Sequence, residues 1–538
     1  MSKKKYIFNE SKTGELVPAI ILENGNTQSL HSMIDPKNEA QRLISASGNS
    51  DFLIFFGLGG GFAPLYALEN TNAQVLVIDY DKNDVNELLT GKDYSALLNN
   101  NRFCLLVDPS NEQIIKTIHS KFNPALYNGI KTIPLRVRIE QDREKFDNAI
   151  RAVQESIDIA SGDYSVQAHF GKKWFCNIIR NIKNIDTLEY NGLEYQNLQK
   201  KQILNAAIAA AGPSLDSQIP ALAELKSQGV YIICTDTALG SLLYNNIEPD
   251  IVVSIDCQFI SYYHFLTETN YSHYKQNKNN IPLVLDIASP SMLCNIKQFT
   301  PVFFSSAHPL ALYLNSHWRQ FPLFDTSGGN VTHTCLSLAE SLGAQNITLF
   351  GADFAYIRSQ SYARGTYIYP YFHKRQNRLS PAEALFSSFL YRTEFLPHDS
   401  TKIKDYYETA SLRSYRIKLE EKAAKMNCKI ICAKGSGAPV NLHKKNTAKD
   451  ERIFSPVNTD RTISGIEFLS QYRDDIAALP AGDDGDYLNK LNQKERVIFT
   501  TLLPFAAAIK MRNADLTKSS LIEEVKNRSI KEIDQVLG

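Results

Sequence analysis

The sequence predicts an α/β protein whose central region is a parallel sheet covered by helices on both faces. The run AAIAAAGPSLD, from Ala206 to Asp216, is typical of a buried strand that turns into a helix. Apolar strands recur at the spacing of βαβ units over 231–236, 250–256, 301–309 and 346–353, with helical stretches among them. Short strands that alternate with helices are typical of a parallel sheet buried on both faces.

The turn Gly212-Pro213-Ser214 connects the first of these strands to its helix. Glycine lets the backbone approach a ligand closely, and Ser214 is placed to cap the helix. The first N–H groups of a helix, together with the positive end of its dipole, favour an anion. The turn therefore predicts a phosphate site, and an ordinary strand-to-helix turn without a ligand is the alternative.

Polar residues follow several of the predicted strands. They are Asp236, Asp256, His308, Ser327 with Gly328, and Asp353. Any one of them could simply cap a helix. Because the carboxyl ends of parallel strands meet at one edge of the sheet, where α/β proteins bind ligands, we expect these side chains to converge on one site.

Four segments of the chain resemble the motility-associated factor (Maf) glycosyltransferases: AAGPSLD, TDTALGSLLYNNIEPDIVVSID, TSGGNVTHTCLSLAESLGAQNITLFGADF and KGSGAPV. A more distant resemblance is to bacterial sialyltransferases that use CMP-activated sialic acid. Both resemblances fall within residues 165–440. They imply transfer of a nonulosonic acid, such as pseudaminic or legionaminic acid, from its CMP donor to Ser or Thr of flagellin, and hence a role in flagellar assembly and motility.

The same resemblance implies roles for tyrosines and a histidine. In the similar sialyltransferases two tyrosines contact the departing phosphate. Tyr362 matches one of them, whereas the other position is Ala355 here, with Tyr356 beside it. An inverting transfer also needs a base for the acceptor hydroxyl, and histidine is the usual choice. His373 is the first candidate, and the alternatives are His308, His333 and His398.

Asp236 and Asp256 stand where the sialyltransferases carry asparagines that touch the nucleotide. Two carboxylates repel a phosphate unless they bind ribose hydroxyls, the cytosine amino group or a metal ion. We favour ribose and base contacts, so that no cofactor is required, with Mg²⁺ as the alternative. Bound Mg²⁺ would favour a pyrophosphokinase of the pterin type, a group that shares the Gly-Pro-Ser-Leu turn. Against it, no Lys or Arg cluster accompanies the acids in the sequence.

Residues 1–160 predict a second Rossmann-like domain. A strand over 51–56 leads into the loop Gly57-Leu58-Gly59-Gly60-Gly61, and the next strand ends at Asp79. An acid about 20 residues beyond such glycines is typical of dinucleotide and S-adenosylmethionine sites, but the full G-x-G-x-x-G pattern is lacking. We favour the alternative that these glycines only allow close helix–strand packing.

The remaining chain predicts a central catalytic domain over 161–440 and a linker with a helical region over 441–538. A helical connector at 146–185 leads into the central domain, and the C-terminal helices are expected over 491–512 and 520–537. With 58 Lys and Arg against 57 Asp and Glu, the charge predicts neither nucleic-acid nor membrane-surface binding. We expect no signal peptide and no membrane span, and the scattered cysteines favour a cytoplasmic protein.

These inferences predict a CMP-nonulosonate-dependent glycosyltransferase whose acceptor is flagellin. A pyrophosphokinase of the same superfamily is the second hypothesis. A non-catalytic flagellin-binding protein is the third.

Overall fold

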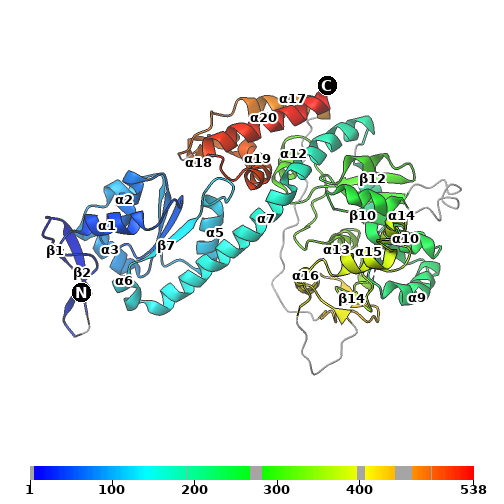
Figure 1. The fold of residues 1–538 in the computed structure, drawn as a ribbon, viewed down its shortest axis with the longest axis horizontal. Helices are drawn as coiled ribbons and strands as arrows, with labels where there is room; N and C mark the ends of the chain where they lie inside the picture. The colour runs from blue at the N-terminus through cyan, green and yellow to red at the C-terminus, as the bar shows by residue number, and fades with distance from the viewer. Residues whose placement is uncertain are drawn as a thin grey trace. The chain divides into compact units, whose positions relative to one another are not determined.

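The computed structural model describes residues 5–22, 24–190, 192–266, 281–396, 406–442, 463–485 and 487–538. The chain forms two compact units, which Figure 1 draws in sequence colours. The first unit is Met1–Lys172 with Asp475–Lys531, and the second is Lys173–Asp474 with Glu532–Gly538. The C-terminal residues are therefore divided between the two units, and the boundaries expected at 160 and 440 stay a prediction.

The first unit is built on a four-stranded parallel sheet with the strand order β6-β5-β4-β7. Strands β4 (Phe52–Phe56) and β5 (Gln74–Asp79) are buried along their whole length, as a sheet covered on both faces requires. Alternate side chains of β4 enter two different cores. The other strands are β6 (Phe103–Val107) and β7 (Ile130–Pro134).

Helices and a small antiparallel sheet complete this unit. The antiparallel strands are β1 (Tyr6–Glu10), β2 (Leu16–Ile21) and β3 (Thr27–Ser29). The helices are α1 (Pro36–Ser45), α2 (Phe62–Asn70), α3 (Lys82–Gly91), α4 (Ser95–Leu98), α5 (Asn111–Lys121), α6 (Arg136–Gln141), α18 (Tyr487–Lys490), α19 (Gln493–Arg512) and most of α20 (Lys518–Leu537). The expected connector is α7 (Arg143–Thr187), whose residues from 173 onward belong to the second unit.

The second unit contains a seven-stranded parallel sheet with the order β12-β11-β10-β9-β8-β13-β16. Its strands are β8 (Asn205–Ala209), β9 (Tyr231–Thr235), β10 (Ile251–Ser254), β11 (Ile281–Asp286), β12 (Phe299–Phe304), β13 (Asn346–Phe350) and β16 (Lys429–Cys432). The chain adds β9 to β12 on one side of β8 and then returns to the other side. The carboxyl ends of β8 and β13 therefore form a topological switch point, where such folds bind ligands.

Helices surround this sheet (Figure 1). They are α8 (Leu193–Gln199), α9 (Leu215–Ser227), α10 (Asp236–Tyr244), η1 (Phe259–Phe265), η2 (Ser291–Asn295), α12 (Pro309–His317), α13 (Val331–Ser341), α14 (Ile368–Arg375), α15 (Ala382–Leu390) and α16 (Ala410–Lys425). Helix α17 (Gly465–Ala477) packs on α12, where Phe468 meets Tyr313 at 6.0 Å. A short ribbon pairs β14 (Tyr356–Ile357) with β15 (Tyr406–Tyr407). The predicted fold class, with two Rossmann-like parallel sheets and a helical C-terminal region, is confirmed. None of the helices in the described ranges combines the length and apolarity that crossing a bilayer requires.

Candidate active site

Asp236 joins the ends of two neighbouring strands. It begins α10 directly after β9 and is 1% exposed. One carboxylate oxygen accepts hydrogen bonds from the Thr237 N–H (2.7 Å) and hydroxyl (3.2 Å), and the other accepts from the Ser254 hydroxyl at the end of β10 (2.6 Å). These three bonds occupy most of its acceptor capacity, so Asp236 braces the site, and its contact with a nucleotide stays a prediction.

Asp256 is the more accessible of the two predicted acids. It follows β10, is partly exposed, and accepts the Gln258 N–H at 2.9 Å. Burial raises the pKa of its carboxyl, and the charge of Asp236 adds to this shift, while Lys173 opposes it. A carboxylate in this position can accept hydrogen bonds from sugar hydroxyls or from an amino group.

His264 lies beside these acids, although no sequence signal singled it out from the aromatic run of η1. Its Nε2 is 3.5 Å from the Thr237 hydroxyl oxygen, and its ring meets the Tyr367 ring edge-on at 4.5 Å. Because that hydroxyl donates to Asp236, it accepts from Nε2–H, which leaves Nδ1 as a bare acceptor. Nδ1 is buried without a hydrogen-bond partner in the part of the chain that the structure describes. Burial lowers the pKa of His264, so its ring is neutral at pH 7.

Of the two predicted tyrosines, Tyr362 lies over the end of β8. The Ala363 N–H donates to the Ala211 carbonyl at 2.9 Å, which fixes Tyr362 there, with its ring 6.4 Å from that of Tyr367. Burial raises the pKa of Tyr362, so its hydroxyl stays protonated and can donate to a phosphate. Tyr356, in β14, is buried, and its proximity contributes to the raised pKa of Tyr362.

The turn Gly212-Pro213-Ser214 lies at the switch point and holds an internal carboxylate. Asp353 follows β13, is 5% exposed, and accepts the Ser214 N–H at 2.8 Å. A Cβ atom on Gly212 would lie 2.4 Å from the Asp353 carboxylate, so the approach of Asp353 accounts for this glycine. The N-terminus of α9 therefore already faces an anion, and phosphate binding at the turn stays a prediction.

The predicted capping role of Ser214 is wrong. Its side chain makes no capping hydrogen bond to α9. Its hydroxyl instead accepts the Ser436 N–H at 3.0 Å and so ties the turn to the loop after β16. The sequence could not reveal this contact, because the two serines are 222 residues apart.

The loop Ser327-Gly328-Gly329 is flanked by cations that its own neighbourhood in the sequence lacks. Ser327 is exposed, and its carbonyl accepts from Lys418 Nζ at 2.9 Å, while Lys422 lies 3.6 Å from Asp325. Both lysines belong to α16. These lysines lie at Ser327 and Asp325, so the expectation that no Lys or Arg cluster accompanies Asp236 and Asp256 stays a prediction.

The other expected histidines that the structure describes make no hydrogen bond or ion pair to Asp236 or Asp256. His373 is exposed in the last turn of α14, without a hydrogen bond, ion pair or ring contact to other described residues. His308 caps α12, and burial lowers its pKa to about 3. The His333 ring lies against Gly328, and its Nδ1 forms a hydrogen bond with Asn330 Oδ1. Burial lowers the pKa of His333 to about 4. His398 falls outside the described residues.

Amides of α7 hold the loops that follow β10 and β11. Asn177 Nδ2 donates to the carbonyls of Cys257 (3.0 Å) and Ala288 (2.8 Å). Asn181 Nδ2 donates to the carbonyls of Ile287 and Ser289, both at 2.8 Å. Their spacing of four residues places both amides on one face of the helix. This spacing was the only sequence signal for their positioning role.

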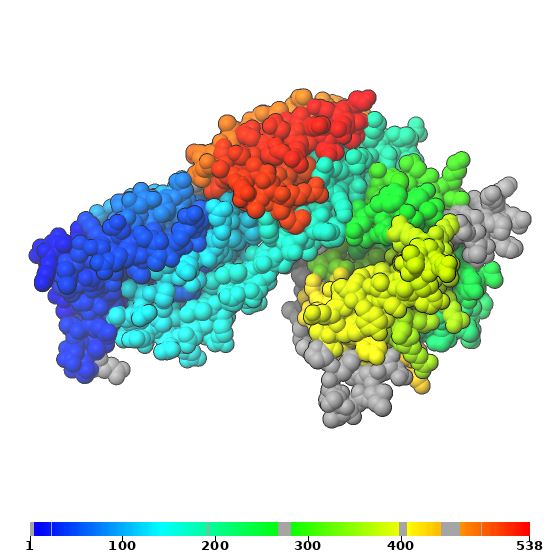
Figure 2. Space-filling model, viewed as in Figure 1, coloured from blue at the N-terminus to red at the C-terminus, as the bar shows by residue number. Residues whose placement is uncertain are grey.

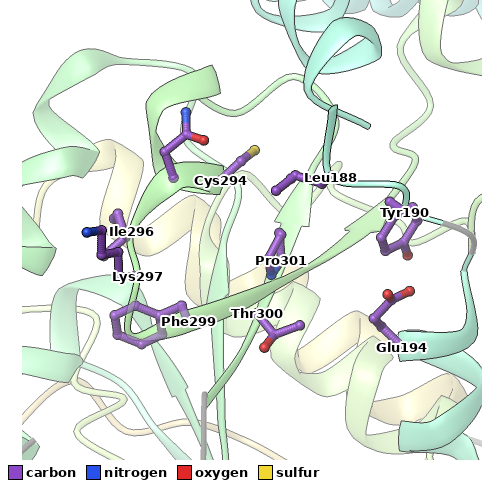
Figure 3. A pocket seen from close by; sticks show the side chains of 10 residues that line it. Leu188, Tyr190, Glu194, Cys294, Ile296, Lys297, Phe299, Thr300 and Pro301 are labelled. Atoms are coloured by element: carbon purple, nitrogen blue, oxygen red, sulfur yellow. The ribbon is translucent and has the colours of Figure 1, made fainter. Parts of the chain in front are cut away.

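A pocket of about 390 Å³ lies elsewhere, at the amino end of β12 (Figure 3). Its lining residues are Leu188, Tyr190, Glu194, Cys294, Asn295, Ile296, Lys297, Phe299, Thr300 and Pro301. None of the predicted site residues is among them. Ligands of parallel α/β sheets bind at the opposite, carboxyl ends of the strands, so we keep the candidate site there.

Side chains of the first unit form hydrogen bonds with the backbone of its glycine-rich loop. The Gly60 N–H donates to His31 Nε2 (2.8 Å), and the Gly60 carbonyl accepts from Lys92 Nζ (2.8 Å). The Tyr94 hydroxyl donates to the Gly59 carbonyl at 2.6 Å. These contacts favour the packing role of the glycines over a cofactor site.

The amino-acid sequence is similar to those of several known proteins. Residues 176–359 match the family described as 6-hydroxymethylpterin diphosphokinase MptE-like. Two uncharacterized proteins of Treponema pallidum (strain Nichols) are 32% identical over 120 residues and 33% identical over 110 residues. The matches cover 22% and 20% of this chain, and 42% and 49% of the relatives, so the chain spans less than half the length of these curated relatives.

A solved Maf glycosyltransferase from Magnetospirillum magneticum AMB-1 has the same overall fold. The alignment covers 100% of this chain and 91% of that chain, with a TM-score of 0.55 and 13% identity. The chain has the fold of a Maf glycosyltransferase. The resemblance inferred from the motifs is thereby confirmed at the level of the fold.

Proposed function

We propose that this chain is an inverting glycosyltransferase that moves a nonulosonic acid of the pseudaminic or legionaminic type from its CMP donor to Ser or Thr of flagellin. The observation that carries the proposal is the gathering of Tyr362 and the two strand-end acids at the carboxyl edge of a sheet with the Maf fold. We place the reaction in the cytoplasm, where it would serve flagellar assembly and motility.

The proposed reaction makes modest demands on the protein, because CMP is already a good leaving group. The acceptor oxygen attacks the anomeric carbon, and the bond from that carbon to the phosphate oxygen breaks with its electron pair on CMP. The protonated Tyr362 hydroxyl and the backbone N–H of Gly328 would stabilise the phosphate, and Lys418 binds the Ser327 carbonyl of the same loop. The Ser327 N–H already donates to Asp325 at 2.9 Å. Asp256 would accept from the ribose or the base.

The acceptor proton passes to a histidine. His373 is solvent-exposed and can be reached by a protein hydroxyl, so it remains our proposed base. His264 is the competitor, because its bare Nδ1 lies in the acidic cluster, but that atom is buried until a neighbour moves. Separate substitutions of the two histidines distinguish the two roles.

A pyrophosphokinase is the second candidate, favoured by the family match over 176–359. Transfer from ATP would require the acids to hold Mg²⁺. The internal hydrogen bonds of Asp236 oppose this, as does the lack of any cluster of three His, Cys, Asp or Glu side chains with metal-site geometry in the described ranges.

Calorimetric titration of the full chain with CMP, and with ATP and Mg²⁺, separates the two candidates. Asp256→Ala and Ser327→Ala should each weaken CMP binding about tenfold or more, since a hydrogen bond to a charged group contributes about 1.5–3 kcal/mol. Ser120→Ala, an exposed serine of α5, is the matched control. Magnesium-dependent ATP binding without CMP binding would support the pyrophosphokinase.

The third hypothesis, a non-catalytic binder, needs a cellular readout. The intact mass of flagellin is measured in cells that carry the wild type or Asp256→Ala. Loss of the glycan mass while flagellin binding persists would exclude it.

A further inference from the structure

A segment with excess positive charge borders the candidate site. Residues 358–392, which we call the basic hairpin, carry six Arg and Lys against one carboxylate, Glu383, whereas the whole chain has 58 against 57. All six cations are exposed: Arg358, Arg364, Lys374, Arg375, Arg378 and Arg392. Its helices α14 and α15 lie in the yellow-green to yellow part of the second unit in Figure 2, which also includes α16.

Aromatic contacts anchor the basic hairpin next to the strand-end groups. Tyr367, directly before α14, packs on His264, and Tyr371 meets Tyr263 of η1 at 5.2 Å. On the other side of α14, Phe372 packs against Phe386 of α15 at 5.0 Å. The inner side of the basic hairpin thus touches the proposed donor site, while its cations are exposed, with Arg364 lying 3.9 Å from Asp216.

Two of these cations stack on aromatic rings. The guanidinium of Arg375 lies 3.9 Å from the Tyr371 ring centroid, and that of Arg392 lies 3.7 Å from the Phe389 centroid. Neither forms an ion pair within the described ranges. An arginine stacked in this way keeps its N–H groups free for a planar, bidentate bond to a carboxylate. Between the two helices, Leu379 is 92% exposed and offers an apolar contact among the charges.

We propose that the basic hairpin docks an acidic, partly apolar segment of the acceptor protein and so delivers its hydroxyl to the site. The proposal rests on the glycosyltransferase function proposed above. Opposite charges accelerate the encounter and fix its orientation, and a nearly neutral chain offers this attraction only where cations gather. A free sugar acceptor would need no such charged surface.

Steady-state transfer to flagellin by the full chain tests the proposal. Arg375→Glu/Arg378→Glu should raise the KM for flagellin about three- to thirtyfold at low ionic strength, and salt should diminish the difference. CMP release from the donor without acceptor should stay unchanged. Arg143→Glu/Arg151→Glu, on exposed positions of α7, makes the same change in net charge and should leave KM unchanged. An unchanged KM in the hairpin variant, or an equal rise in the control, overturns the docking surface.

Fluorescence anisotropy with a labelled Glu- and Leu-containing peptide measures the affinity of the basic hairpin for an acidic segment and does not require glycosyl transfer. The wild type should bind this peptide at low salt, and the hairpin variant should lose at least threefold in affinity. Binding to phosphatidylglycerol vesicles without binding to the peptide overturns the proposal in favour of a membrane surface. If the wild type neither binds CMP nor hydrolyses the donor but still binds the peptide through these arginines, the proposed function fails while the docking surface stands.

Discussion

The two parallel sheets treat the acids at their strand ends differently. In the first unit, Asp79 at the end of β5 pairs with Arg138 at 2.9 Å and accepts the N–H groups of Leu58 and Tyr80, and both charged side chains are fully buried. In the second unit, Asp286 ends β11 and Asp353 follows β13, both without a cation partner among the described residues, and burial raises the pKa of each. In the first unit, an ion pair neutralises the acid at the strand end. In the second unit, two acids lack a cation partner and the buried Nδ1 of His264 lacks a hydrogen-bond partner among the described residues, which is typical of a functional site.

The largest expected effect lies in the second unit, at the base. His373→Ala should lower transfer to flagellin by about 10²–10⁴-fold while donor hydrolysis and CMP affinity change little, because the base faces the acceptor. His264→Gln is the matched variant. Initial rates are measured from pH 5 to pH 8 for each protein.

The activities of the two variants, together with the pH profile expected for His264, decide between the two histidines. Burial lowers the pKa of His264 below its ordinary 6.5, so a reaction that uses its neutral ring would lose activity only below that pH. If His373→Ala keeps full transfer with this acid limb, and His264→Gln loses transfer, the base is His264 and our assignment is wrong.

The second effect concerns the ion pair at the strand end of the first unit. Arg138→Met should destabilise that unit by about 3–5 kcal/mol, since it leaves Asp79 buried without its counter-ion. Hydrogen exchange of peptides from β4 and β5 measures the loss. Asp79→Asn in the same chain should recover part of it. CMP affinity should not change, and a fall would move the nucleotide site to the first unit.

The third effect tests an acid without a cation. Burial raises the pKa of Asp286 to about 6 from an ordinary 3.8, so the folded state holds the proton more tightly than the unfolded state. Stability should therefore fall as the pH rises from about 4 to about 6, by about 3 kcal/mol in total, and then level off. Asp286→Asn keeps an acceptor for the Ala288 N–H and cannot ionise, so it should be more stable than the wild type at pH 7.5 but not at pH 4. Equal urea midpoints at pH 7.5 would contradict this.

The smallest effect concerns Ser214. Ser214→Ala removes the acceptor of the Ser436 N–H and should cost about 0.5–1.5 kcal/mol, while CMP affinity stays the same because Asp353 already occupies the turn. A tenfold loss of CMP affinity would instead support the phosphate site predicted at this turn. Thermal unfolding and CMP titration of one preparation give both values.

Much of the second sheet could be predicted because its local signals are strong. The runs at β8, β9 and β10 are apolar, short and followed by polar residues, which identifies buried parallel strands without any tertiary information. Strands β11 and β16 lay outside the expected set. For β16 the reason is visible: only Ile430 of its four residues is buried, so its pattern resembles that of a loop.

The sequence by itself determined the fold class, the positions along the chain of the strands that polar residues follow, and the motifs shared with Maf glycosyltransferases. Each of these depends on residues close together in the chain. Only the tertiary structure decided which polar groups are already satisfied. Asp353 fills the turn at Gly212, Arg138 neutralises Asp79, and α16 brings Lys418 to Ser327. Partners so far apart in sequence leave no local pattern, since a buried charge or N–H is satisfied by whatever the fold places beside it.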